Sequence, residues 1–459
     1  MELRSDAVVF FGVTGDLVAK KLFPALYELT RRGRLDLPVI GVARSRWDDQ
    51  QLITAARKSV VEANDRVDDE AFDRLAGNLT MISGDYADPA TYQHLAETLS
   101  TAERPLFYLA IPPAVFGAVV DGLAAVGLAA RGRVVVEKPF GHDLASSYEL
   151  NGALRAAFAP ERIFRIDHYL GKESVEGLRV FRFANRLFEP LWNAEHIDNV
   201  QITLAEGFGT EGRAGFYDRM GATRDVLQNH MLQVVALLAM EPPTGAGDDA
   251  FREEEVRVLR QIEPLSPEST VRGQYAGYTD EPGVAPGSRT ETFVATRLRV
   301  NSPRWAGVPF YLRTGKLMPG TATEVVVEFK TPQRDLVPAA DGAGTQPNLL
   351  RFRLGRNDGI TLSIQAKDPG AEVASRPVEL PVDFDAALGH RREAYERLLD
   401  DALEGRHLRF AREDAIEQEW RIVEPVLDLT EPVASYPRGS WGPADAEAMA
   451  GGWHPPTLR

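Results

Sequence analysis

Val8-Val9-Phe10-Phe11-Gly12-Val13-Thr14-Gly15-Asp16-Leu17 is the stretch on which the fold prediction depends. Its apolar start predicts a short buried strand, its glycines predict a tight turn, and the pattern from Val18 to about Arg32 is helical. Strand, glycine turn and helix in this order open a dinucleotide-binding βαβ unit. Gly12 and Gly15 fit the last two glycines of the GxGxxG fingerprint, although Phe10 stands where the first would be. Taken alone, the stretch is also compatible with a plain tight turn.

A second buried strand, Pro38 to Ala43, ends at Arg44. In NAD enzymes the corresponding strand end usually carries an acid for the ribose hydroxyl, whereas an arginine there accommodates a 2′-phosphate. Arg44, with Arg46 nearby, therefore predicts NADP, with NAD as the weaker alternative. The plainer interpretation is an exposed arginine after a strand.

The alternation of apolar strands and amphipathic helices continues through Leu79–Ser83, Leu106–Ile111 and Val134–Val136. This pattern predicts a parallel sheet covered on both faces, with ligands beyond the carboxyl ends of the strands. We therefore expect the residues at these strand ends to face the cofactor, namely Tyr108, Glu137, Lys138 and Pro139.

The second half of the chain changes to segments that alternate with period two. The first is 199–206, and later ones are 293–300, 308–313, 324–329, 350–354 and 360–366. Between them, Ala222 to Met240 reads as a long helix that carries Asp225 and His230, which would diverge by about 140° in an α-helix. The predicted fold is an α/β Rossmann-like N-terminal domain (residues 1–170) followed by an α+β domain (171–459) with a large, mainly antiparallel sheet.

Composition narrows the class of protein. The 459 residues contain no cysteine, which excludes disulfides, thiolate metal sites and cysteine nucleophiles, and we predict no metal site. Fifty-two basic against 67 acidic residues give a net charge of −15, which argues against a nucleic-acid partner. No apolar run approaches the length of a membrane span, and no secretory leader is recognisable, so we expect a cytoplasmic protein without a membrane partner.

Arg165-Ile166-Asp167-His168-Tyr169-Leu170-Gly171-Lys172 places an acid, an imidazole, a phenol and an ammonium within six residues. Gly171 predicts a turn that brings His168, Tyr169 and Lys172 onto one side. Three converging donors suit an anionic ligand, above all a phosphate. Because the average charge of the chain repels anions, such a site must concentrate its cations locally.

Five segments in a fixed order resemble the glucose-6-phosphate 1-dehydrogenase family. They are Gly12–Leu17, Glu137–Gly141, Arg165–Lys172, Asp225–His230 and Val308–Lys316. The similarity runs from about residue 7 into the C-terminal region. It implies hydride transfer from C1 of D-glucose 6-phosphate to NADP, giving 6-phosphogluconolactone and NADPH in the oxidative branch of the pentose phosphate pathway.

The resemblance also implies roles for individual residues. His230 matches the general base, and Asp167 matches the carboxylate that orients it. His168, Tyr169 and Lys172 match the phosphate ligands, and Lys138, Glu206, Asp225 and Lys316 match contacts to sugar hydroxyls. The cofactor side matches Gly12, Val13, Thr14, Gly15, Asp16, Leu17, Val18, Ala19, Lys21, Arg44, Tyr108 and Lys138, with Asp85 and Tyr86 as further candidates.

The chain departs from the family pattern at two places. Val18-Ala19 replaces a small-basic pair in the glycine turn, and Gly320-Thr321 stands where a second basic residue is common. One substrate or cofactor contact is therefore either missing or supplied by Arg313 or another segment of the chain. The alternatives are an oxidoreductase acting on an unphosphorylated sugar or polyol, and a non-catalytic regulatory paralogue. The phosphate cluster argues against the first, and the combination of Asp167, Lys138 and His230 argues against the second. We expect a homodimer or homotetramer through an exposed face of the large sheet.

Overall fold

The computed structural model describes residues 4–334, 336–342, 344–355, 357–370, 372–389 and 391–458. The chain forms two compact units. The parallel-sheet unit comprises Met1–Glu173, Thr244–Arg252 and Arg392–Glu417, and the large-sheet unit comprises Ser174–Pro243, Glu253–Arg391 and Gln418–Arg459. The domain division at residue 170 remains a proposal. Within the described ranges, no helix has the length and apolar character that crossing a membrane requires.

The parallel-sheet unit is built on six described strands in the order β3-β2-β1-β4-β5-β6, all parallel. This order confirms the Rossmann-like prediction. The central strand β1 pairs with β2 and β4 and is buried along its whole length, which explains its unbroken apolar sequence. The strands are β1 (Ala7–Phe11), β2 (Val39–Ala43), β3 (Leu79–Ser83), β4 (Pro105–Leu109), β5 (Arg133–Glu137) and β6 (Ile163–Ile166).

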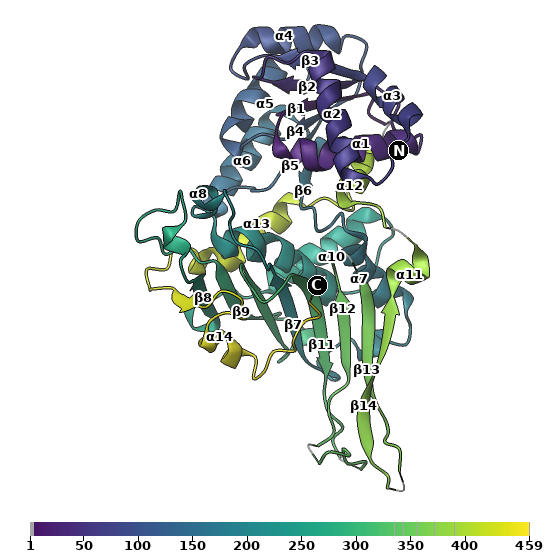
Figure 1. The fold of residues 1–459 in the computed structure, drawn as a ribbon, viewed down its shortest axis with the longest axis vertical. Coiled ribbons are helices and arrows are strands. Elements are labelled where there is room, and N and C mark those ends of the chain that lie inside the picture. The colour runs from purple at the N-terminus through teal and green to yellow at the C-terminus, as the bar shows by residue number, and fades with distance from the viewer. Residues whose placement is uncertain are drawn as a thin grey trace. The chain divides into compact units, whose positions relative to one another are not determined.

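Helices cover this sheet in two groups (Figure 1). One group is α1 (Phe23–Arg31), α2 (Asp49–Ala63) and α3 (Asp69–Gly77), and the other is α4 (Pro89–Thr98), α5 (Phe116–Ala125) and α6 (Leu144–Ala157). A late helix, α12 (Ala394–Glu404), joins the first group. Its Leu398 and Leu403 belong to the same apolar core as Val8 and Leu26.

The large-sheet unit has nine described strands in the order β14-β13-β12-β11-β7-β10-β9-β8-β15. Only the pairs β7–β10 and β8–β15 are parallel among the described strand pairs, so the prediction of a mainly antiparallel sheet is confirmed. The strands are β7 (Ile197–Ala205), β8 (Thr270–Tyr275), β9 (Phe293–Arg299), β10 (Pro309–Gly315), β11 (Ala322–Phe329), β12 (Leu349–Arg353), β13 (Gly359–Lys367), β14 (Ser375–Asp383) and β15 (Ala434–Tyr436).

Three of these strands, β8, β14 and β15, were not predicted. The β14 sequence contains Pro377 and Pro381, which weaken a strand prediction because proline cannot donate to a ladder. β14 lies at the edge of the described sheet, where β13 is its one neighbouring strand and its first residue, Ser375, forms a further bridge to Ala339.

The helix predicted over 222–240 has a different hydrogen-bond pattern from the α-helical one that was expected. It begins as the π-helical segment η5 (Thr223–Met231) and continues as α9 (Leu232–Ala239). In a π-helix residue i+5 bonds back to residue i, so position 230 lies one turn beyond position 225. The expected divergence of Asp225 and His230 was therefore wrong, because it assumed α-helical geometry.

We predict that Gly12→Ala destabilises the protein more than Gly33→Ala. Both glycines have positive φ, at +83° and +66°, so alanine at either one strains the backbone by roughly 1–2 kcal/mol. A Cβ at Gly12 would also collide with the Ala110 carbonyl oxygen and lie 2.8 Å from Ile111 Cγ2, whereas one at Gly33 meets nothing within 4 Å. Thermal unfolding followed by circular dichroism should show a melting temperature at least twice as far below wild type for Gly12→Ala. Equal shifts would mean that the close approach of the turn to β4 is unimportant.

Candidate functional site

The turn after β1 is a tight loop closed by hydrogen bonds of its glycines. The Gly12 N–H donates to the Val42 carbonyl at 2.9 Å, and the Gly15 N–H donates to the Gly12 carbonyl at 2.9 Å. These bonds draw the backbone into a tight loop that leads directly into η1 (Val18–Leu22). A Cβ at position 12 would meet the Ala110 carbonyl oxygen and Ile111 Cγ2, so glycine there lets the turn pack closely against the segment after β4.

The predicted cofactor residues of this turn differ in what they expose. The side chains of Val13 and Val18 are buried in the core, so only their main chain can meet a ligand. Asp16 is exposed and pairs with Lys20 at 3.1 Å, and Lys21 is half exposed.

Arg44 and Tyr86 lie at the same end of the sheet as the glycine turn. Arg44 is exposed directly after β2, where it was expected. The Tyr86 hydroxyl donates to the Val42 carbonyl at 3.4 Å. Burial raises the pKa of the Tyr86 phenol, and the Gly12 backbone and the Arg44 charge oppose that rise, so all three groups are neighbours. The structure thus brings Tyr86 to the turn, whereas the Asp85 carboxylate is exposed and accepts the Ala87 N–H at 2.9 Å within its own loop.

Tyr108 and Glu137 form a buried pair at the ends of β4 and β5. The Tyr108 hydroxyl donates to Glu137 Oε1 at 2.5 Å, so the phenol that we expected to face the cofactor is directed at an acid. Tyr395 of α12 also bonds to Glu137. Burial raises the pKa of Glu137 to about 7, although both phenols and Lys138 act in the opposite direction. Sequence analysis missed Tyr395, because nothing in a helix pattern indicates which distant strand end the helix will meet.

The segment after β6 is a tight turn around Asp167, whose carboxylate is 2% exposed. Asp167 Oδ1 accepts the Tyr169 N–H at 2.9 Å, and the next turns are closed by bonds from Leu170 to Asp167 and from Lys172 to Tyr169. Burial raises the pKa of Asp167, while His168 and the Tyr169 N–H offset part of that rise. The aspartate is therefore an acid held out of water next to cations.

The three expected phosphate ligands contact one another, as Gly171 predicted. Lys172 Nζ lies 3.5 Å from the centre of the Tyr169 ring, and the rings of His168 and Tyr169 lie 5.1 Å apart, edge to face. The His168 ring also stacks on Tyr395, with centroids 6.3 Å apart. A cation, an imidazole and a phenol thus occupy one side of the turn, which suits an anion.

Helix α12 holds this turn in place. A Cβ at Gly171 would lie 2.7 Å from Leu398 Cδ1, so only glycine permits the approach. Arg397 Nη1 donates to the Gly171 carbonyl at 2.7 Å. At the start of the segment, Arg165 donates to Asn151 at 2.8 Å and to Glu413 at 3.0 Å, and burial lowers its pKa to about 10.

Glu206 and Lys316 form an ion pair in the large-sheet unit. They follow β7 and β10, which are parallel neighbours, so both residues emerge at the same edge of the sheet. Lys316 Nζ lies 2.6 Å from Glu206 Oε2 and 4.8 Å from the centre of the Tyr217 ring. Charges on Asp225 and Glu206 contribute to the raised pKa of Tyr217, which burial dominates. We call Glu206, Tyr217, Asp225 and Lys316 the Lys316 cluster. Sequence analysis missed Tyr217, one aromatic residue among several near Ala214.

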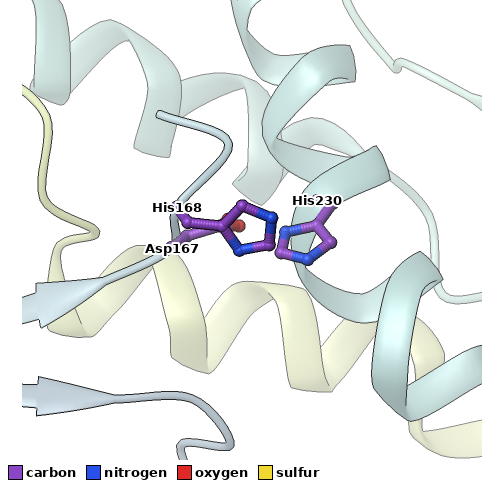
Figure 2. Close-up of side chains that lie close together, drawn as sticks. All are labelled: Asp167, His168 and His230. Atoms are coloured by element: carbon purple, nitrogen blue, oxygen red, sulfur yellow. The ribbon is translucent and has the colours of Figure 1, made fainter. Parts of the chain in front are cut away.

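His230 lies on η5, one π-helical turn after Asp225, and its side chain is buried. Figure 2 shows its imidazole on that helix, and it shows Asp167 and His168 on the turn that follows strand β6. A side chain from another segment holds the first turn of this helix, because the Thr223 N–H donates to Glu291 Oε1 at 3.0 Å.

Arg313 does not replace the missing basic residue near Gly320. Its guanidinium is buried between Trp441 and Trp453, at 4.6 Å and 4.3 Å from the ring centres. It also donates to Thr203 Oγ1 at 3.0 Å. Arg313 therefore ties the C-terminal segment to β10 and is unavailable to a ligand.

Comparison with known proteins covers nearly the whole chain. The family model for "Glucose-6-phosphate dehydrogenase, NAD binding domain" matches residues 9–177, and the model for its C-terminal domain matches 179–453. The chain is similar to glucose-6-phosphate 1-dehydrogenase 1 of Mycobacterium tuberculosis, with 46% identity over 99% of this chain and 97% of that protein. A crystal structure of glucose-6-phosphate 1-dehydrogenase from Mycobacterium avium superposes with a TM-score of 0.91 at 45% identity, covering all of both chains. A glucose-6-phosphate dehydrogenase in complex with its substrate glucose 6-phosphate gives 0.92 at 33% identity, again over all of both chains.

We predict that Glu137→Gln changes how stability depends on pH. The folded protein holds the Glu137 proton more tightly than the unfolded chain does, because its pKa rises from 4.5 to about 7. Wild type should therefore lose stability relative to the variant as pH rises from about 4.5 to 7, by up to roughly 3 kcal/mol, and the difference should then level off. Melting temperatures of both proteins across this range measure it. The exposed Glu97→Gln serves as the control, and a pH-independent difference for Glu137→Gln would contradict the assignment.

Proposed function

Since the chain belongs to the glucose-6-phosphate dehydrogenase family, we propose that it oxidises D-glucose 6-phosphate at C1 with NADP. The products are 6-phosphogluconolactone and NADPH, which places the reaction in the oxidative branch of the pentose phosphate pathway. The observation that carries the proposal is the folded segment Asp167–Lys172, which combines a buried acid with three groups suited to a phosphate. The proposed place of action is the cytoplasm.

His230 is the proposed general base. Oxidation of the hemiacetal removes a proton from the C1 hydroxyl and a hydride from C1, and a neutral imidazole takes the proton. NADP, when bound, supplies the hydride acceptor. Asp167 is the proposed partner of His230: its carboxylate would orient the imidazole and stabilise the imidazolium once the proton has moved. A positioned base of this type accelerates the step roughly 10²–10⁴-fold.

His168, Tyr169 and Lys172 are the proposed ligands of the substrate phosphate. Lys172 offers an ammonium and Tyr169 a phenol, so the group can bind a dianion with charge-assisted hydrogen bonds. Such a site is needed because the net charge of −15 repels the substrate elsewhere. Binding energy from the phosphate then helps hold C1 at the base.

The sugar hydroxyls are assigned to Lys138, Glu206, Asp225 and Lys316. Lys316 donates and Glu206 accepts, and their 2.6 Å pairing keeps both in place before substrate arrives. A sugar hydroxyl donates and accepts at once, so an ammonium beside a carboxylate is a suitable partner for it.

The cofactor is assigned to the turn Gly12–Ala19 with Lys21, Arg44, Asp85, Tyr86, Tyr108 and Lys138. The tight glycine turn that leads into η1 supports binding of the pyrophosphate, and the exposed Arg44 after β2 supports recognition of the 2′-phosphate. Arg44 favours NADP, with NAD as a weaker alternative.

Initial rates with glucose 6-phosphate and with free glucose, each with NADP and NAD, test the function. We expect glucose 6-phosphate with NADP to react fastest. Free glucose should show a kcat/KM lower by roughly 10²-fold or more, because it forgoes the charge-assisted contacts of the phosphate. Equal rates for both sugars would favour the alternative oxidoreductase that acts on unphosphorylated substrates. No turnover with either sugar, despite binding, would favour the regulatory paralogue.

His230→Asn is the matched variant for this test. It should lower kcat about 10²–10⁴-fold while calorimetry shows glucose 6-phosphate binding within a few-fold of wild type. His196→Asn is the control, since His196 precedes β7 and Glu206 follows the opposite end of that strand. A normal kcat in His230→Asn would remove His230 from the role of base.

We also propose that the protein forms a homodimer or homotetramer through the exposed face of β13 and β14. Ile360, Leu362 and Ile364 pair with Val382, Leu380 and Val378, so their side chains share one face. Leu380 is 50% exposed in the single chain. An apolar face of this kind on a sheet edge suits another protein surface.

Leu380→Glu should therefore shift the protein toward smaller species in light scattering at micromolar concentration, because a charge would enter an apolar interface. Leu388→Glu, an exposed leucine on α11 (Phe384–Leu388), is the control. A wild-type monomer, or an unchanged mass for Leu380→Glu, would contradict this interface.

A further inference from the structure

Tyr217 is a member of the Lys316 cluster that no family motif pointed to. It lies on α8 (Ala214–Tyr217) and is 6% exposed. The centre of its ring lies 4.8 Å from Lys316 Nζ. Burial raises the pKa of its hydroxyl, and the negative charges of Asp225 and Glu206 add to that rise, so both carboxylates are neighbours of the ring. The phenol therefore lies among the groups assigned to the sugar hydroxyls.

The backbone that carries this ring is closely packed. The Tyr217 N–H donates to the Arg213 carbonyl at 2.9 Å. A Cβ at Gly215 would lie 2.9 Å from the Gly283 carbonyl oxygen, so the short helix lies closely against a neighbouring loop. A ring held in this way needs little further ordering when a ligand binds.

Three other tyrosines of the same core use their hydroxyls within the protein. Tyr275 donates to Glu281 at 2.6 Å, Tyr278 to Asp218 at 3.0 Å and Tyr436 to the Lys316 carbonyl at 2.8 Å. The Tyr217 hydroxyl makes no hydrogen bond to any residue in the described ranges. This hydroxyl is not one of the fully buried polar atoms left unpaired in the described residues, so it reaches solvent and is open to a partner from outside the chain.

We propose that the Tyr217 hydroxyl binds a ring hydroxyl of the sugar phosphate and so helps select which hexose 6-phosphate is oxidised. The inference rests on the proposed function and adds a specificity residue to it. A phenol both donates and accepts, as a sugar hydroxyl does, and it complements the ammonium of Lys316 and the carboxylates of Glu206 and Asp225. A site built to bond a hydroxyl discriminates against a sugar that lacks it, because the protein group is then left unpaired.

The test compares Tyr217→Phe with wild type on glucose 6-phosphate and on its 2-deoxy, 3-deoxy and 4-deoxy analogues. Tyr278→Phe is the matched control, because it removes a phenolic hydroxyl from the same core whose partner is Asp218. For glucose 6-phosphate, Tyr217→Phe should lower kcat/KM about 3- to 10-fold, mainly through KM. For the one analogue that lacks the contacted hydroxyl, the substitution should have no effect, whereas the other two should lose as much as the parent.

An equal loss for all four substrates, or no loss for any, would overturn the inference. A variant that is merely less stable lowers all rates by one factor, so the comparison among substrates still decides. If Tyr278→Phe showed the same selective pattern, the effect would belong to the core and the inference would fail. A wild-type protein that oxidises no hexose 6-phosphate would overturn the proposed function itself, whereas an active wild type without selectivity at Tyr217 overturns the inference alone.

Discussion

The close packing of α12 against the segment Asp167–Lys172 is the contact that positions Asp167, His168 and Glu137. Leu398 leaves no room for a side chain at Gly171, and Arg397 anchors the carbonyl of that residue. One turn earlier in the helix, Tyr395 stacks on His168 and bonds to Glu137. A single helix therefore determines where the strand end of β5 and the turn after β6 present their polar groups. Since a displaced reacting group costs rate, rigid support of this kind serves the chemistry directly.

Two acids, the buried Asp167 and the partly buried Glu137, make this arrangement unfavourable for stability. Burial raises the pKa of both Glu137 and Asp167, so each ionised carboxylate is less stable in the folded protein than in water. Perturbed acids of this kind gather where a protein needs a proton acceptor or an oriented charge. The cations nearby limit the cost, as Lys138 and Lys172 do for Asp167. In the other unit, the carboxylate of Glu206 is likewise paired with a cation, the Lys316 ammonium at 2.6 Å. These carboxylates are therefore held in place before a ligand binds, and packing elsewhere in the fold offsets the free-energy cost.

The sequence was sufficient for the strands and turns whose signal is local. The apolar run of β1, the glycines that follow it and the exposed Arg44 were all predicted. Each of these features depends on residues that are close to it in the sequence. The segment Asp167–Lys172 was recognised by its chemistry. The π-helical register of η5 was missed, since apolar periodicity does not separate it from an α-helix. Tyr395 and Tyr217 were missed for another reason: periodicity tells which face of a helix is buried, but it does not tell which distant group that face will meet.

The discontinuity of the parallel-sheet unit has a consequence for its synthesis. Its apolar core includes Leu398, Leu403 and Phe410, which leave the ribosome after more than two hundred residues of the other unit. Domains made of one continuous stretch can fold as soon as they emerge, N-terminal first. This unit cannot close its core in that way, because a gap against α1 stays open until α12 arrives. During translation the part of α1 that α12 later covers stays exposed, and the loop 165–172 acquires its support only after α12 has been made.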